Sequence, residues 1–338
     1  MSPLGGCESG AEEGPAAVEY SFQVPDFAGR WYKGNTHAHT TESGGDSSPE
    51  QVARWYRDHG YDFLVLSDHN VLTDPARFLH LQDSTFLLIP GEEVSSTFDE
   101  KPVHVNGLAI RELVEPQVDT TMVGTIQRNV DAIREVDGAP HINHPNYRWA
   151  FGFEELVRVE NDRLLEIWNG HPQVHNYGSE ERQDIEKVWD RLLSSGKEIF
   201  GIAVDDAHDF QGEFSRDRAN PGRGWVAVRA SDLSASAIVT ALEAGHFYAS
   251  TGVELDDVIV TPKRIEVVIR PVGDFRYRTY FVGENGLILS VVSGTRAVFD
   301  LTEPQRYVRA RVLDSGGGLA WVQPVQVTRA FGDPNSQP

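Results

Sequence analysis

The sequence predicts a parallel α/β fold followed by a smaller antiparallel β region, and three observations support this. Apolar runs without polar alternation recur through the first 250 or so residues, helical patterns separate them, and these patterns stop after about Thr251. Strands of a parallel sheet covered on both faces are apolar throughout, and strand–helix alternation is typical of such folds. The length of 338 residues suits a barrel-sized domain with a smaller appendage.

Regular elements can be assigned within the first part of the chain. The clearest inner strands are residues 62–66, 85–89 and 199–204. A helix is expected from Pro49 to His59, because Ser48 can cap it, a proline suits the first turn and Gly60 ends it. Further helices are predicted at 121–136, 179–193 and 234–243.

The second part of the chain reads as short strands joined by turns. The expected strands are 264–270, 277–282, 287–292, 297–301, 307–313 and 319–327, with a hairpin turn at Asn285-Gly286. We therefore expect four segments: residues 1–20 without regular structure, an α/β barrel over 21–252, a small all-β domain over 253–330, and a frayed end over 331–338.

Histidines and carboxylates cluster where apolar runs end. These residues are His37, His39, His69, Glu93, His104, His144, Glu166, Asp206 and His208. In a closed α/β barrel, the carboxyl ends of the strands meet at one mouth, so residues far apart in sequence can bind the same ions. Side chains at positions i and i+2 of a strand share a face, so His37 and His39 can hold one ion. The pattern predicts a multinuclear metal site and hence a hydrolase.

From Trp31 to Thr251 these motifs resemble the polymerase and histidinol phosphatase (PHP) superfamily of metal-dependent hydrolases. The matching motifs are His37-x-His39, Asp68-His69, Gly91-x-Glu93 with His104, His144-Pro145 and Asp206-x-His208. The resemblance implies a distorted (β/α)7 TIM-like barrel that carries two or three divalent ions. It implies one ion on His37, His39, Glu93 and Asp206, a second on His69 and His208, and a third on His104 and His144, with Glu93 bridging.

The first motif departs from the family pattern in one place. Many relatives carry a carboxylate or histidine ligand in a Ser-Asp-Gly turn, where this chain has Ser43-Gly44-Gly45-Asp46. Asp46, two residues beyond the usual position, is a candidate ligand if the Gly-Gly loop bends toward the second ion. Otherwise that ion is held by fewer protein ligands and more water.

Several neighbouring residues have less specific interpretations. Glu92 is expected to face away from Glu93 and to be solvated or hydrogen-bonded. Asp68 and Asp205 are expected to orient imidazoles rather than to bind metal. Glu166 is expected to support the cluster or touch substrate, and His141 to be a core or rim residue. The remaining histidines are interpreted as surface or hydrogen-bonded residues: His59, His80, His171, His175 and His246.

The mixed ligand set predicts Zn, Mn or Fe as the cofactor. Two such ions can hold a bridging hydroxide that attacks a phosphoester, with Asp206 and His208 at the catalytic centre. Arg148 is the first candidate for contacting a phosphoryl oxygen, ahead of Arg216 and Arg218. We expect a phosphoesterase that acts on a small phosphorylated metabolite or nucleotide.

Two alternatives use the same fold. The run from Gly222 to Val226, the segment from Gly245 to Gly252 and the β tail also resemble the carbaryl-hydrolase-type branch of the family, which implies carbamate, ester or amide hydrolysis. A non-catalytic scaffold or regulatory domain is the other alternative, although such a domain is expected to have lost ligands.

Composition restricts the partners and the location. A net charge of −21 without a basic block argues against a stable nucleic-acid partner, and no apolar run is long enough for a membrane span. The single cysteine, Cys7, fits a cytoplasmic protein. The segment Leu4-Gly5-Gly6-Cys7 would instead be a lipoprotein processing site, and the protein exported, if translation started upstream. The sequence predicts no oligomeric state.

Overall fold

The computed structural model describes residues 18–26 and 29–331. Its α-helices are α1 (Pro49–Asp58), α2 (Met122–Glu135), α3 (Phe153–Leu156), α4 (Ile185–Ser195) and α5 (Ala235–Glu243). Short 3-10 turns occur at Pro75–Leu81, Tyr147–Trp149 and Glu284–Gly286. No helix of the described residues has the length and apolar character needed to cross a bilayer.

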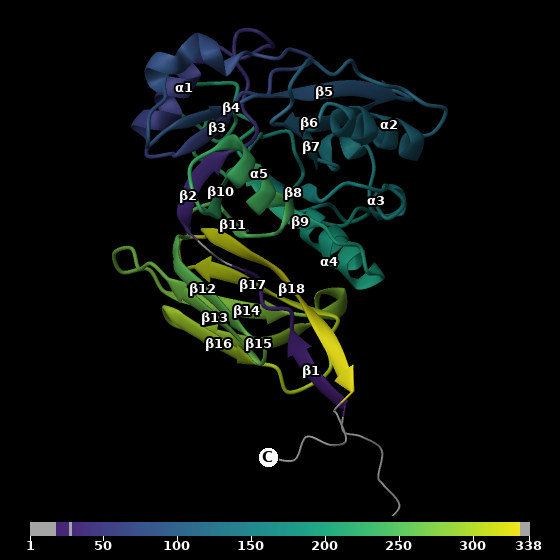
Figure 1. Ribbon diagram of the computed structural model, residues 1–338, viewed down its shortest axis with the longest axis vertical. Helices are drawn as coiled ribbons and strands as arrows, with labels where there is room; N and C mark the ends of the chain where they lie inside the picture. The colour runs from purple at the N-terminus through teal and green to yellow at the C-terminus, as the bar shows by residue number, and fades with distance from the viewer. Residues whose placement is uncertain (1–17, 27–28, 332–338) are drawn as a thin grey trace, which may run out of the picture.

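Two sheets form the upper part of the molecule (Figure 1). The first contains β2 (Arg30–Asn35), β3 (Phe63–Val65), β4 (Leu87–Ile89), β10 (Trp225–Ala230) and β11 (Phe247–Ser250). The second has the order β5-β6-β7-β8-β9, with bounds Gly91–Phe98, Lys101–Leu108, Ala139–Ile142, Leu164–Asn169 and Phe200–Val204. The predicted inner strands are therefore present, and they belong to both sheets.

The expected (β/α)7 barrel does not close into one hydrogen-bonded sheet. Residues 91–108 form an antiparallel hairpin, β5–β6, instead of another parallel strand and helix. Asp99 and Glu100 at its turn have φ of 48° and 62°, the left-handed pair that a tight two-residue hairpin requires. Single bridges join the two sheets at Ala38–Ala207 and His69–Glu93. The fold is a mixed α/β arrangement in which the two sheets meet at these single bridges.

The C-terminal strands belong to two sheets: three of them form a separate three-stranded sheet, and the other four are part of the ten-stranded sheet. They are β12 (Leu255–Thr261), β13 (Arg264–Ile269), β14 (Tyr277–Val282), β15 (Ile288–Ser293), β16 (Arg296–Asp300), β17 (Tyr307–Asp314) and β18 (Leu319–Phe331). The long strand β18 pairs with β17 on one side and with β11 on the other, so the ten-stranded sheet runs through both parts of the molecule. The sequence boundary at residue 252 therefore cuts across one sheet.

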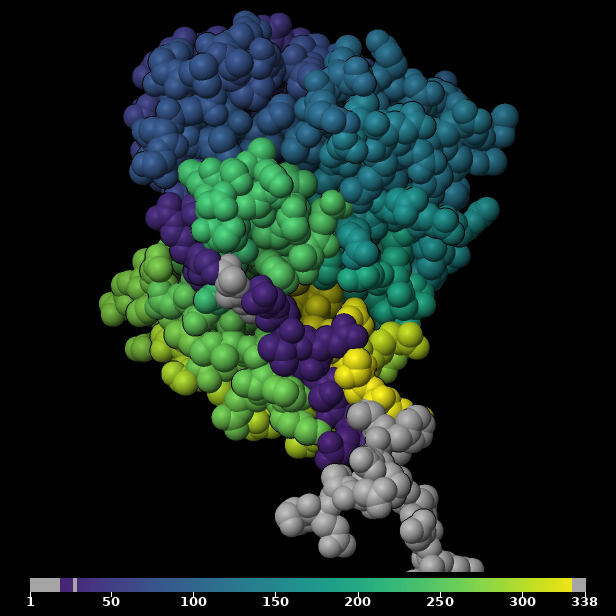
Figure 2. Space-filling view, in the orientation of Figure 1, coloured from purple at the N-terminus to yellow at the C-terminus, as the bar shows by residue number. Residues whose placement is uncertain are grey.

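The beginning of the described chain is also part of this sheet. Strand β1 (Val18–Phe22) pairs antiparallel with the last strand, β18, and the two lie side by side in Figure 2. The prediction that regular structure is absent through residue 20 is therefore wrong for residues 18–20. The rest of that segment, residues 1–17, and residues 332–338 of the frayed end lie outside the described residues.

The helices begin and end close to where their capping residues predict. Ser48 caps α1 with a full capping box, and Pro49 occupies its first turn. Helix α4 starts six residues later than expected, because the Asp184 side chain accepts a hydrogen bond from the Lys187 N–H and caps the helix there. The left-handed Gly196 ends this helix.

A buried ion pair joins α4 to β17. The Arg309 guanidinium, whose side chain is 1% exposed, donates Nε and Nη2 to the two carboxylate oxygens of Asp190, each at 2.7 Å. Nη2 also lies 2.7 Å from Oε1 of Glu186. The Tyr307 hydroxyl donates to Asp190 over 3.0 Å. This network fixes the helix of the α/β part against the C-terminal strands.

We expect Arg309→Met to lower the free energy of unfolding by about 3–5 kcal/mol, because it leaves the buried Asp190 carboxylate without its cation, whereas Glu186 keeps Arg311. Arg264→Met is the matched control, since that guanidinium is 51% exposed and pairs with Asp300 on the surface. The control should change stability by about 1 kcal/mol or less. Urea unfolding measures both, and equal effects of the two substitutions would show that the buried pair adds nothing.

Candidate metal centre

The candidate site lies where the two sheets meet. Backbone bonds connect the end of β2 to the segment after β9: the Asp206 N–H donates to the His37 carbonyl at 3.0 Å, and the His39 N–H donates to Ala207 at 2.9 Å. On the other side, the Glu93 N–H donates to the carbonyl of Asp68 at 3.2 Å. These bonds bring the ends of β2, β3, β5 and β9 together.

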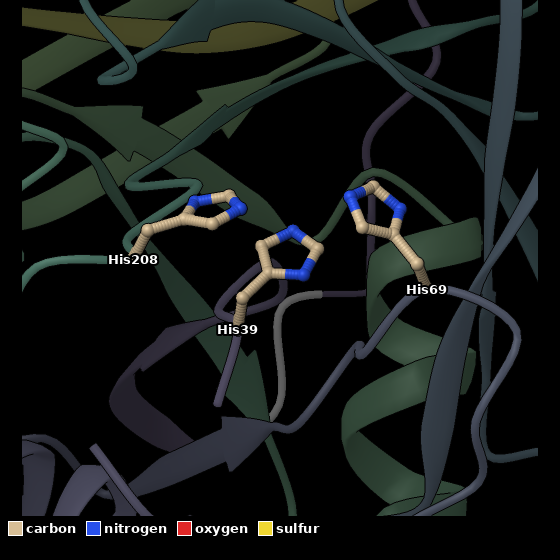
Figure 3. A group of neighbouring side chains, drawn as sticks. All are labelled: His39, His69 and His208. Carbon is tan, nitrogen blue, oxygen red and sulfur yellow. The ribbon is translucent and has the colours of Figure 1, made fainter. Parts of the chain in front are cut away.

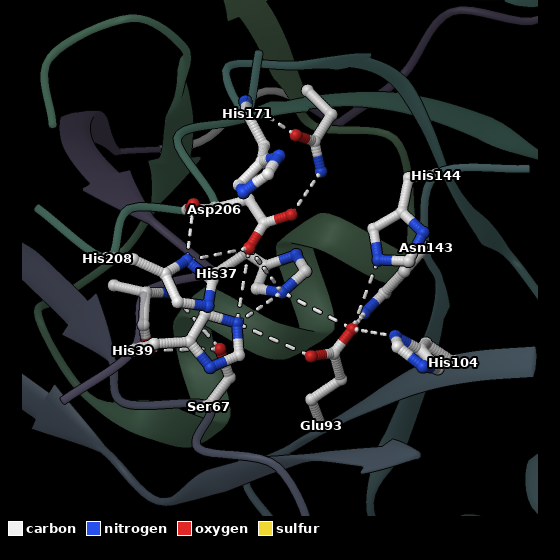
Figure 4. A network of polar contacts seen from close by, with 12 residues as sticks. His37, His39, Ser67, Glu93, His104, Asn143, His144, His171, Asp206 and His208 are labelled. Atoms are coloured by element: carbon white, nitrogen blue, oxygen red, sulfur yellow. Dashed lines mark hydrogen bonds and ion pairs between the residues drawn. The ribbon is translucent and has the colours of Figure 1, made fainter. Parts of the chain in front are cut away.

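Eight of the nine predicted metal ligands converge there (Figure 4). Four groups of ligand atoms each lie within 4.8 Å of one another: His37, His39 and Asp206; His37, Glu93 and His144; His69, Glu93 and His104; and His39, His69 and His208. Figure 3 shows the last of these groups, whose three imidazoles come from separate segments. Residues up to 171 positions apart thus share one cluster.

The hydrogen bonds of His37 and His39 direct two lone pairs to one point. His37 Nδ1 lies 2.6 Å from Oε1 of Glu166, a carboxylate that can only accept when ionised. His39 Nδ1 lies 3.2 Å from the hydroxyl of Ser43, which itself donates to Asp68 at 2.6 Å and so must accept from the imidazole. Both Nδ1 atoms therefore carry the proton. When both rings are neutral, the two Nε2 atoms, 3.1 Å apart, present lone pairs to each other.

Two carboxylates complete this arrangement. Oδ1 of Asp206 lies 3.4 Å from Nε2 of His37 and 3.2 Å from Nε2 of His39. The two oxygens of Glu93 lie 3.5 and 3.4 Å from the same nitrogens. Ligand atoms about 2.1 Å from a shared cation are separated by roughly 3.0–3.4 Å in octahedral or tetrahedral geometry. The side chains of His37, His39 and Asp206 therefore fit a single divalent ion, and Glu93 lies beside them.

Glu93 lies between the remaining histidines. Its Oε2 is 2.7 Å from Nδ1 of His69, and its Oε1 is 2.9 Å from Nδ1 of His104 and 3.2 Å from Nε2 of His144. The Asn143 amide donates to Oε1 at 2.8 Å and holds the carboxylate in place. Glu93 thus contacts ligands of each ion that the resemblance implies, and it could be shared among them.

The charges of the site also favour cations. Within the described chain, the ion-pair partners of Glu93, Glu166 and Asp206 are all histidines. Burial opposes ionisation of Glu93, but the charges of His104, His69 and His37 hold its pKa well below the usual range. Burial would lower the pKa of His37, yet the surrounding carboxylates raise it well above its ordinary value. A divalent ion can supply the positive charge that this proton supplies otherwise.

Two predicted residues do not join the cluster. The Asp46 carboxylate accepts hydrogen bonds from the backbone N–H groups of Phe210 and Gln211 and contacts Arg218, so it organises the neighbouring loop. Arg148 is exposed, lies against the ring of Tyr147 and does not line the pocket at the cluster. Of the weaker candidates, Arg218 is engaged with the same loop and Arg216 is exposed.

The neighbouring carboxylates of Asp68 and Asp205 accept hydrogen bonds from backbone N–H and hydroxyl groups, and neither directly contacts an imidazole of the described residues. Asp68 accepts from the N–H and hydroxyl of Thr40 and from Ser43, and it acts on His39 only through Ser43. Asp205 accepts from the Tyr56 hydroxyl and from three consecutive N–H groups that begin at Gly222. The expectation that both orient an imidazole is therefore correct only for Asp68, through one intervening hydroxyl.

The pocket over the cluster includes residues that the sequence did not single out. It has a volume of about 110 Å³, and its additional lining residues are Tyr147, His171, Gln173 and Val174. His171 Nδ1 accepts from the N–H of Gln173 at 3.2 Å, so a neutral ring carries its proton on Nε2. His171 is hydrogen-bonded, as expected, but it also lines the pocket, which was not predicted from the sequence. The available signal was its place just beyond the apolar strand that ends at Asn169.

Comparisons with known proteins give a likeness of fold. No family model and no curated protein matches the chain. A two-domain protein from Bacteroides vulgatus, said to contain a predicted PHP-like metal-dependent phosphoesterase, matches 90% of this chain and 95% of its own, at 17% identity and a TM-score of 0.52. The chain therefore shares the fold of a PHP-like protein over nearly its whole length.

Two further solved structures match shorter parts. A candidate metal-dependent phosphoesterase from Bifidobacterium adolescentis is 12% identical, with 59% of this chain and 91% of that chain covered and a TM-score of 0.41. An amidohydrolase from Chromobacterium violaceum, with bound sulfate and no metal, is 15% identical, with 55% and 93% covered and a TM-score of 0.38. Both scores are too low to support an inference about this chain.

We expect Glu166→Gln to weaken metal binding about 10- to 100-fold, because it disturbs the group that orients His37. One oxygen of Glu166 accepts from His37, and the other accepts from the His144 N–H and the Asn169 amide. In either orientation of the substituted amide, its NH2 group would face donors from which it cannot accept. Titration calorimetry with Mn²⁺ measures the change. Glu154→Gln, at a 77% exposed carboxylate, is the control. Unchanged affinity in Glu166→Gln would exclude this orienting role.

Glu92 faces away from the cluster. Its carboxylate is buried, accepts from the Val114 N–H at 3.0 Å and has one oxygen without a hydrogen-bond partner. Burial raises its pKa to about 7. The folded state therefore keeps a proton that the unfolded chain loses near its ordinary pKa of about 4.5. The contribution of Glu92 to stability is therefore fully present below about pH 4.5 and is lost as the pH rises through 7.

We expect the free energy of unfolding of Glu92→Gln to exceed that of the parent protein by more at pH 8 than at pH 4.5. The increase in this difference should be roughly 3 kcal/mol. The amide oxygen can still accept from Val114, and the amide does not ionise. Urea unfolding of chelator-treated protein at both pH values provides the measurement. A stability difference that does not change with pH would show that Glu92 titrates normally.

Proposed function

We propose that this chain is a member of the PHP superfamily and a metal-dependent phosphoesterase that acts on a small phosphorylated metabolite or nucleotide. The observation that carries the proposal is the convergence of the His37 and His39 lone pairs with Glu93 and Asp206 at ligand spacing. A structural role alone gives no reason to bury this many unneutralised carboxylates and imidazoles together. Retention of eight ligands also argues against a degenerate scaffold.

We further propose two or three divalent ions of Zn, Mn or Fe as the cofactor. His37, His39, Glu93 and Asp206 would hold one, His69 and His208 a second, and His104 and His144 a third, with Glu93 shared among them. Such ions, when bound, polarise substrate oxygens and make water a nucleophile near neutral pH. The imidazole-rich ligand set favours these metals over Mg or Ca.

The residues of the chain determine how a substrate is positioned. His171 presents a fixed Nε2–H at the pocket, where it can donate to a substrate oxygen and does not compete as a metal ligand. Asn169 donates to Oδ2 of Asp206 at 3.1 Å, so it leaves Oδ1 directed at the histidines. The pocket of about 110 Å³ admits a small head group, so the remainder of a substrate would extend outward.

One observation favours a second candidate, hydrolysis of a carbamate, ester or amide. No lysine or arginine is among the described residues that line the pocket, so the protein supplies no cation dedicated to a phosphoryl group. A neutral carbonyl substrate would use the same ions and the same donor on His171. The carbaryl-hydrolase-type branch belongs to this second proposal.

The experiment compares metal-loaded protein on two substrates, p-nitrophenyl phosphate and 1-naphthyl N-methylcarbamate, with Mn²⁺ or Zn²⁺ added after chelation. We expect turnover of the phosphate, its loss on chelation and its return with metal. The double variant His37→Ala/His39→Ala should lose metal and lower kcat/KM by at least about 1,000-fold, because it removes the ligands that define the first ion.

Each result selects one function. Turnover of the carbamate alone would replace the phosphoesterase proposal with the second candidate. A protein that binds no divalent ion by elemental analysis and hydrolyses neither substrate would contradict both. Full activity in the double variant, with an unchanged circular dichroism spectrum, would remove the first motif from the reaction.

A further inference from the structure

A second and larger cavity lies away from the metal cluster, between α4, the end of β8 and the strands β14, β15, β17 and β18. Figure 1 shows α4 beside these strands. Its volume is about 550 Å³, which is within the range of roughly 300–1,000 Å³ for small-molecule sites. None of its lining residues lines the pocket over the metal cluster.

Aromatic rings form part of the wall. The indoles of Trp168 and Trp321 have centroids 6.2 Å apart and planes inclined by 33°. The Tyr177 ring meets Trp168 edge-on at 5.6 Å, although Tyr177 is itself 75% exposed. Ile288 at the rim is 49% exposed. These exposed apolar surfaces are suited to covering a flat ring.

The polar atoms left without partners around this cavity are donors. Trp168 Nε1, Arg309 Nη1 and Arg311 Nε are buried and have no hydrogen-bond partner. The nearby carboxylates of Glu186 and Asp190 already accept from the arginines through other nitrogens. Because buried donors are rarely left unsatisfied, the missing group is an acceptor.

The charges around the cavity balance. Three lining residues are acidic and three are basic: Asp184, Glu186, Asp190, Lys187, Arg309 and Arg311. A single negative charge is therefore not repelled by a net charge of the lining, and it would find arginine and indole N–H groups. We propose that this cavity is a second binding site, which takes a small aromatic anion such as an aryl carboxylate or aryl sulfonate.

Hydrogen bonds connect the cavity to the metal pocket. Asn176 lines the cavity, and its side chain makes two hydrogen bonds with the backbone of Asn169, at 2.9 and 2.8 Å. Asn169 in turn donates to Asp206. The segment that carries Asn176 also carries His171 and Gln173 of the metal pocket. The second site is thus in hydrogen-bonded contact with the metal centre, but the proposal does not depend on what reaction that centre performs.

The test uses the fluorescent probe 8-anilinonaphthalene-1-sulfonate, titrated into the full chain. We expect Ile288→Glu to weaken its binding at least about tenfold, because it places a carboxylate at the rim of the cavity. Val291→Glu is the matched control: Val291 lies on the same strand with the same 49% exposure and does not line the cavity. It should bind the probe as the parent does. Circular dichroism confirms that both variants are folded.

A second arm tests recognition of the anion. N-phenyl-1-naphthylamine lacks the sulfonate, and we expect it to bind the parent about tenfold more weakly than the sulfonate probe. Arg311→Gln should abolish this difference. Equal loss of binding in the Ile288 and Val291 variants, or equal affinity of the parent for the charged and neutral probes, would overturn the proposal. Both of these comparisons hold even if the Arg311 variant does not fold.

Discussion

The structure depends on one electrostatic constraint, the burial of Glu93, Glu166 and Asp206 among histidines. A buried carboxylate costs several kcal/mol unless a cation or hydrogen-bond donors compensate for lost water. Glu166 receives such donors from His37, His144 and Asn169. Glu93 and Asp206 each accept from one amide, of Asn143 and Asn169, and their remaining oxygens face imidazole nitrogens. This arrangement is stable only when positive charge, from protons or from metal ions, occupies the space between them.

The same constraint accounts for local backbone strain. His144 and Asp206 both have positive φ, 22° and 48°, which non-glycine residues rarely adopt. Both carry predicted ligand atoms, and the backbone around each is fixed by hydrogen bonds, from the His144 N–H to Glu166 and from the Asp206 N–H to the carbonyl of His37. Strained residues held in this way concentrate at functional sites.

Much of the site could be predicted from sequence because its residues obey local rules. The i, i+2 spacing of His37 and His39 places both on one face, and ligands follow apolar strands whose carboxyl ends meet. Asp46 could not be assigned, because the N–H groups that capture its carboxylate come from residues 210 and 211, far along the chain. His171 was missed because its role depends on a loop that returns to the pocket.

The positions of the strands and helices could be predicted from the sequence, but the pairing of the strands could not. Strand and helix positions follow from apolar runs and caps, but the hairpin at Asp99 carries no Asn-Gly signal, and the pairing of β11 with β18 joins segments about 70 residues apart. Closure of a barrel is a property of such distant pairs. Neither hydrophobic period nor propensity determines it.

Anomalous diffraction from crystals grown with Mn²⁺ or Zn²⁺ tests the central claim most directly. The account predicts a strong peak within bonding distance of Nε2 of both His37 and His39 and of an oxygen of Asp206. Further peaks are expected beside Glu93. A map with no peak at this position would contradict the account. So would ions bound only at surface carboxylates, with the rings of His37 and His39 in an unchanged arrangement.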